Sequence, residues 1–240
     1  MTEAHESAVD QGSPDPTGPR QRFESVEAAA VAGVAFAGLA FVASSLLGAQ
    51  PGASATTAEI SAWYGDSANR TSVVTALVLT TFAVIAFLWF IAVIRRRAGE
   101  REDQFFATVF LGSGFLVAAT LLTGVTVISS VAIGMELQGG SLPDSGAFTI
   151  VNGLGNGLLL LVLPRLQAVF IITTSTVGFR TGAFPRWLAV FGYLIGLGML
   201  IVPLLIDPIV LIFPLWVGLM SGVLFVRRKR SHTGDGLPPS

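Results

Sequence analysis

The sequence predicts an all-α integral membrane protein, a polytopic bundle of six transmembrane helices with both termini in the cytoplasm. Three observations lead to this fold class. The chain of 240 residues is 52% hydrophobic and only 12% charged, which is about half the charged share of a soluble domain. Its mean hydropathy is +0.72. Its charged residues are also spaced so that they divide the chain into uncharged segments of membrane-spanning length.

These uncharged segments have the length that transmembrane helices need. A helix rises about 1.5 Å per residue, so about 20 apolar residues cross the hydrocarbon core. The alternation of transmembrane strands is missing from the segments. We expect one transmembrane domain over residues 26–228, between disordered cytoplasmic tails at 1–25 and 229–240. Its helices should lie near residues 28–48, 72–94, 106–134, 149–177, 187–206 and 209–226.

The distribution of basic residues predicts the orientation of the helices. With six helices, 12 of the 14 Lys and Arg residues fall on one side, and Arg70 is the one basic residue among the opposite loops. This is the positive-inside pattern, and it places both termini in the cytoplasm. One alternative stays open, in which Arg20, Arg22, the first apolar segment and Ala53-Ser54-Ala55 form a cleaved signal peptide.

The segment 149–177 carries the candidate functional residues. On a regular helix Asn152, Asn156 and Gln167 share one polar stripe. Pro164 should kink this helix, because it lacks a backbone N–H. Arg165 then lies near mid-membrane, where a charge costs about 2.5–3.5 kcal/mol, so it must face the bundle interior, reach the interface or pair. The acidic candidates for such a pair are Glu27, Glu136 and Asp207.

This stripe allows two interpretations. In the first, it lines a polar pathway or an anionic-ligand site, with Arg165 as the positive charge and Pro164 as a hinge. In the second, its amides only hold neighbouring helices together. Small-residue pairs of the GxxxG type support close helix packing, within the chain or at a dimer face. They are Gly153 with Gly157, Gly192 with Gly196, and Gly218 with Gly222.

Three aromatic residues are predicted to be interfacial anchors. Residues 58–64 place Ile60, Trp63 and Tyr64 on one helical face. This pattern favours a short helix in the headgroup layer, with a lid over an outward pocket as the alternative. Trp187, which follows Phe184-Pro185-Arg186, should lie in the aromatic belt at the start of its helix.

The absence of catalytic motifs argues against an enzyme. The sequence contains no HExxH, GxSxG, Walker-type or CxxC motif, and no cysteine at all. No Asp, Glu or His lies in the middle of an expected helix, and both histidines, His5 and His232, lie in the tails. We therefore expect no catalytic, metal-binding or cofactor-binding residues and no cofactor. The expected partners are the lipid bilayer and a second copy or a membrane protein, and not nucleic acid.

The order of several short motifs resembles a family of small, uncharacterised multi-pass membrane proteins of actinobacteria, which contain domains of unknown function. The motifs span most of residues 24–228. They are Glu59-Ile60-Ser61-Ala62-Trp63-Tyr64, Arg95-Arg96-Arg97, Phe184-Pro185-Arg186-Trp187, Gly192-Tyr193 and Phe213-Pro214-Leu215-Trp216. The thirteen arginines and single lysine also suit a GC-rich genome. The resemblance implies no activity, because that family has no agreed catalytic residues.

These observations together predict an integral protein of the bacterial cytoplasmic membrane. The leading functional hypothesis is a small transport or permeation unit that uses the polar stripe of residues 149–177. The alternative is a non-transporting scaffold or partner subunit that assembles through its Gly-rich helix faces.

Overall fold

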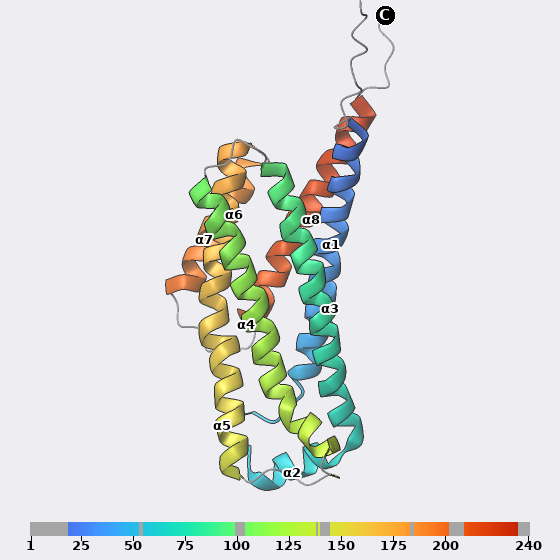
Figure 1. Cartoon of the computed structure of the whole chain (residues 1–240), viewed down its shortest axis with the longest axis vertical. Coiled ribbons are helices and arrows are strands. Elements are labelled where there is room, and N and C mark those ends of the chain that lie inside the picture. The colour runs from blue at the N-terminus through green and yellow to red at the C-terminus, as the bar shows by residue number, and fades with distance from the viewer. Residues whose placement is uncertain are drawn as a thin grey trace, which may run out of the picture.

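A computed structural model describes residues 19–52, 55–98, 104–137, 139, 145–182, 185–201 and 209–234. Within these ranges every regular element is a helix (Figure 1). Side chains are described for a smaller set that omits, among others, residues 19–30 and 227–234. The elements are α1 (Pro19–Leu47), α2 (Thr57–Gly65), α3 (Ser67–Ala98), α4 (Gln104–Leu137), α5 (Ser145–Asn156), the π-helix η2 (Gly157–Val162), α6 (Leu163–Thr181), α7 (Arg186–Ile201) and α8 (Ile209–Gly234).

Three helical segments are long and apolar enough to cross a membrane, which indicates a membrane protein. They are Ser67–Arg95, Phe105–Leu137 and Gly146–Thr181, the last of which runs through α5, η2 and α6. Three shorter apolar helical segments accompany them: Val31–Leu47, Arg186–Ile201 and Leu211–Val226.

The two terminal helices extend further than the sequence predicts. Helix α1 begins at Pro19 and α8 continues to Gly234, so residues 19–25 and 229–234 are helical where we expected disordered tails. Proline suits the first turn of a helix, and the Arg, Gln and Glu residues that follow are good helix formers. The remaining parts of the predicted tails, residues 1–18 and 235–240, lie outside the described residues.

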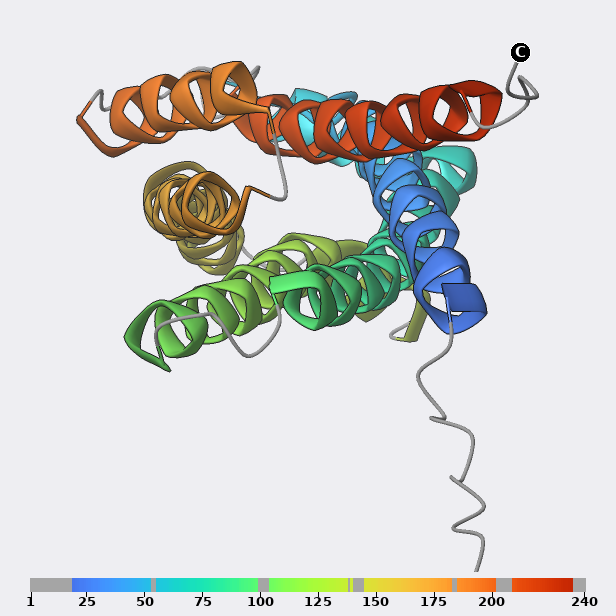
Figure 2. The same ribbon diagram turned by 90° about the horizontal axis from the view of Figure 1, so that it is seen from above.

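The bundle has two distinct ends. The end at which Arg95, Arg180 and Arg186 lie is called the basic end, and the opposite end, where α2 lies, is called the cap end (Figure 1). Helix α1 packs mainly against α3 and α8, α3 packs against α4, and α6 packs against α4 and α7 (Figure 2). Helices α7 and α8 do not reach the cap end, which is built by α2, by the long helices α3 and α4, and by α5.

Small residues set the contact between α6 and α7. A Cβ built on Gly192 would lie 2.0 Å from Oγ of Ser175, and one on Gly196 would lie 3.1 Å from the carbonyl oxygen of Ala168. This predicted GxxxG pair therefore lies in an interface within the chain. By contrast, no atom lies within 4 Å of a Cβ built on Gly153 or Gly157.

We expect Gly196→Ala to destabilise the bundle by about 1–3 kcal/mol, because the added methyl group forces α7 away from the α6 backbone. Thermal unfolding in detergent measures this effect. The matched control is Gly198→Ala on the same helix, where the new Cβ would meet no atom within 4 Å. That control should leave stability unchanged or raise it by up to about 1 kcal/mol. Equal melting temperatures for the two variants would contradict the described α6–α7 contact.

Candidate functional site

A small, partly open cavity of about 40 Å³ lies where six elements meet. A site of 10–15 Å³ holds one water molecule, so this cavity has room for about three. Its lining is mostly apolar and contains no ionisable residue. The lining residues are Phe36, Ala40, Ala43, Ser44 and Leu47 of α1, Thr80 and Ala83 of α3, Leu121 and Val125 of α4, Leu159 of η2, Gln167 of α6 and Pro214 of α8.

Gln167 is the most polar group in this lining. Its side chain is 2% exposed, and its amide oxygen has no hydrogen-bond partner among the described residues. Thr80 is also buried and donates its hydroxyl hydrogen to the carbonyl of Ala76 at 2.8 Å, which leaves its oxygen free to accept. A buried amide without a partner costs about 1–3 kcal/mol. A water molecule or another small polar molecule in the cavity would remove this cost.

The π-helix η2 determines which residues of α6 face the cavity. Pro164 has no N–H, and the turn before it is wide, with the N–H of Leu163 bonded to the carbonyl of Leu158. A π turn takes up one more residue than an α turn, so the side chains that follow are displaced by about one position, or 100°. Before the proline, Phe148 and Leu159 are buried. After it, Gln167 and several later residues of α6 are buried.

The polar stripe predicted on a regular helix is therefore divided. Asn152 and Asn156 are half-buried and hydrogen-bond to each other, and neither of them lines the cavity. Gln167 lies in the cavity, together with residues of the other helices. The predicted irregularity at Pro164 is present, but it takes the form of a π turn, which the sequence analysis did not anticipate.

Arg165 does not line the cavity, and its hydrogen-bond partner is a backbone carbonyl of the preceding π-helix. Its guanidinium donates to the carbonyl oxygen of Leu161 at 2.7 Å, and its side chain is half-buried. No carboxylate of the described residues lies within 4.0 Å of it. Of the predicted acidic partners, Glu136 pairs with Arg70 instead. The side chain of Glu27 and the whole of Asp207 lie outside the described residues.

Aromatic side chains close the cavity on the side of the basic end. Phe36 borders the cavity, and its ring centroid lies 5.0 Å from that of Phe87 and 5.8 Å from that of Phe213. Phe170 lies 5.2 Å from Phe87 and 5.1 Å from Phe110. These five rings come from α1, α3, α4, α6 and α8, and each is at most 1% exposed. We call them the aromatic cluster.

Helix α2 covers the cap end. Thr56 and Glu59 form a capping box at its N-terminus. At its C-terminal end, Arg70 of α3 donates to the carbonyls of Tyr64 and Gly65 at 2.7 and 3.0 Å. The same guanidinium forms an ion pair with Glu136 of α4, with an Nε–Oε1 distance of 2.5 Å. Sequence reasoning did not predict these Arg70 contacts, which we call the Arg70–Glu136 clasp. Arg70 and Glu136 are nevertheless opposite charges predicted on the same side of the membrane.

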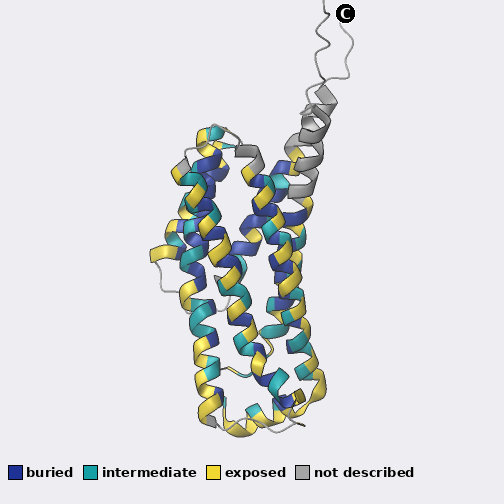
Figure 3. Cartoon of the chain, in the orientation of Figure 1, coloured by how far each residue is buried: buried dark blue, intermediate teal, exposed yellow. Residues whose placement is uncertain are grey.

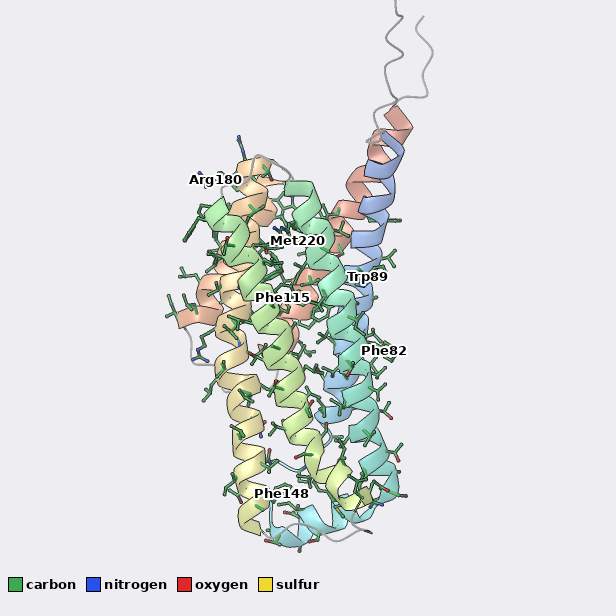
Figure 4. All side chains as sticks on the ribbon, in the orientation of Figure 1. Phe82, Trp89, Phe115, Phe148, Arg180 and Met220 are labelled. Carbon is green, nitrogen blue, oxygen red and sulfur yellow. The ribbon has the colours of Figure 1, made fainter. Side chains whose placement is uncertain are left out.

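Tyr64 packs α2 against the rest of the bundle. Its side chain is 2% exposed, its ring lies 6.0 Å from that of Phe148, and its hydroxyl donates to Oε1 of Gln50 at 3.1 Å. Figure 4 shows Phe148 beside α2. Trp63 is half-buried and packs against the group of buried residues that contains Tyr64 and Phe148. The predicted role of Tyr64 as an interfacial anchor, and the choice between a headgroup-layer helix and a lid for α2, stay predictions.

The remaining predicted anchor faces outward. Trp187 is 55% exposed at the start of α7. Its predicted place in an aromatic belt stays a prediction, as does the predicted absence of a cofactor. Among the residues that the structure describes, no group of three or more His, Asp or Glu side chains is placed to hold a metal ion.

The comparisons with known proteins give no further assignment. No family model, curated protein or solved structure matches the chain. The resemblance to uncharacterised actinobacterial membrane proteins thus stays a prediction. We therefore infer the function from the cavity, the aromatic cluster and α2.

The ionisation of Tyr64 tests the packing of α2. Burial raises the pKa of Tyr64 to about 12, whereas an unfolded tyrosine has a pKa near 10. The stabilisation from neutral, buried Tyr64 is therefore complete below pH 10 and is lost as the pH rises toward 12. In a Tyr193→Phe background, the tyrosinate absorbance of the folded protein should have its midpoint near pH 12. The same variant in denaturant should titrate near pH 10. A midpoint near pH 10 for the folded protein as well would contradict the buried position of Tyr64.

Proposed function

We propose that this protein is a small permeation unit of the bacterial cytoplasmic membrane, in which the Gln167 cavity is the midpoint of the path. The observation that supports this proposal is the buried amide oxygen of Gln167, which has no partner among the described residues and belongs to a side chain that lines a small cavity between six elements. Six helices would cross the membrane, with both termini and the basic end in the cytoplasm, as the positive-inside pattern favours.

The cavity lining favours a small neutral solute. No charged side chain lines it, so an ion would lose its hydration shell without compensation. Hydrogen-bonding groups are available from Gln167 and Thr80, and the volume fits only a few non-hydrogen atoms. The proposed passengers are therefore water and small uncharged polar molecules. This replaces the anionic-ligand hypothesis, because Arg165, which would have supplied the positive charge, does not line the cavity.

The aromatic cluster and α2 are the two proposed gates. The aromatic cluster separates the cavity from the cytoplasm, and α2 with its Arg70–Glu136 clasp covers the external end. Two features that can weaken a helix adjoin the cavity: the π-helix η2 before Pro164, and Pro214 inside α8. Such interruptions occur in transporters at midplane sites, where half-helices shift against the rest of the bundle. In this proposal the structure represents the closed state.

A flux measurement in proteoliposomes tests the proposal. Stopped-flow light scattering with water, urea and glycerol should show permeation above that of protein-free liposomes, decreasing as the solute becomes larger. Gln167→Leu should lower the flux by about fivefold to tenfold, because it removes one hydrogen bond of about 1 kcal/mol along the path. Asn156→Leu makes the same amide-to-aliphatic change on the preceding helix, outside the cavity, and should leave the flux unchanged.

Two results would contradict permeation. One is a flux equal to that of protein-free liposomes for every solute. The other is an equal effect of the two Leu variants. A second role, a scaffold that assembles with a copy of itself or a partner protein, would then lead. The observation that favours it is the open space at Gly153 and Gly157 on the surface of α5 and η2.

A further inference from the structure

A surface groove of about 430 Å³ lies between the ends of α3 and α4 that face the basic end. This volume is within the range of ligand pockets in proteins. The groove is separate from the Gln167 cavity and shares no lining residue with it. Its lining residues are Arg95 of α3, and Ala107, Thr108, Leu111, Gly112 and Phe115 of α4.

The groove changes from polar to apolar along its length. Arg95 and Thr108 lie at the basic end, and Arg95 is exposed. Toward the middle of α4 the lining becomes Leu111, Gly112 and Phe115, and Phe115 is 52% exposed (Figure 4). An arginine above an apolar slot matches a phospholipid, whose phosphate carries negative charge and whose acyl chain is apolar.

Gly112 keeps the groove open. A Cβ built on this residue would meet no atom within 4 Å, so the protein itself leaves this space unfilled. Three and four residues further along α4, Phe115 and Leu116 continue the exposed apolar surface. The slot therefore extends along the direction that an acyl chain follows in a bilayer.

We propose that this groove binds one anionic phospholipid of the cytoplasmic leaflet, with its phosphate at Arg95 and one acyl chain along Gly112. The charge argument selects an anionic lipid. Arg95 has no carboxylate within 4.0 Å among the described residues, and the sequence continues with Arg96 and Arg97. Basic pockets between transmembrane helices on the cytoplasmic side are known to bind anionic headgroups. The proposal is independent of permeation through the bundle.

Native mass spectrometry of the purified full-length protein tests this site. The probes are phosphatidylglycerol, phosphatidylcholine with the same acyl chains, and glycerol phosphate, which has a phosphate but no chains. The wild-type protein should bind one phosphatidylglycerol about fivefold more tightly than phosphatidylcholine, because the positive choline group of phosphatidylcholine offsets the attraction of its phosphate to Arg95. It should not bind glycerol phosphate measurably at the same concentration.

Two variants separate the headgroup from the chain. Arg95→Gln should reduce the preference for phosphatidylglycerol to nearly one, and Gly112→Leu should weaken the binding of both lipids by filling the slot. The matched controls are Arg186→Gln, an exposed arginine at the same end, and Gly134→Leu, another open glycine of α4. Both controls should bind lipid as the wild type does, and thermal unfolding checks that all four variants fold.

Three outcomes would overturn the proposal. Equal affinity of the wild type for the two lipids would remove the role of charge. Equal losses in a variant and its control would show general contact with lipid and no site at this groove. Binding of glycerol phosphate with the same affinity would identify a free-phosphate site without a place for the acyl chain.

Discussion

The π turn before Pro164 is the constraint on which the interior of the bundle depends. A proline inside a helix leaves one carbonyl without its donor and crowds the preceding turn. Here the chain accommodates it by widening Gly157–Val162 into a π-helix. The extra residue places Gln167 in the cavity and leaves Arg165 to bond to the carbonyl of Leu161. A charge that would be expensive in the interior thus stays out of it, and a neutral amide takes the inward position.

The amide oxygen of Gln167 has no partner among the described residues, which is unusual because the bundle is packed on either side of the cavity. On one side, the aromatic cluster joins five helices, and all five of its rings are buried. Figure 3 shows the buried residues of the bundle in dark blue. On the other side, α2 is tied down by Tyr64, Arg70 and Glu136. Buried polar groups without partners are rare in well-packed proteins. Of the side chains with such an atom in the described structure, Gln167 is the one that lines the cavity.

The sequence predicts the helices well because apolar length and charge spacing are local properties. The six expected segments all fall within observed helices or start in them, and residues 58–64 form the expected short helix. The interior of residues 149–177 could not be predicted, because angular reasoning assumes 100° per residue and one inserted residue changes every position after it. The contact between Tyr64 and Phe148 could not be predicted for another reason: an aromatic side chain with a polar tip suits both a headgroup layer and a packed contact within the chain.

The most direct measurement of this account compares spin labels at positions 165 and 167 in a membrane. The protein contains no native cysteine, so Arg165→Cys and Gln167→Cys can each be labelled without background. Power-saturation EPR reports the collision rate with dissolved oxygen, which is concentrated in lipid. The account predicts a higher oxygen collision rate at 165 than at 167. The reverse order would show that α6 continues α5 as a regular helix, with Arg165 turned toward the interior.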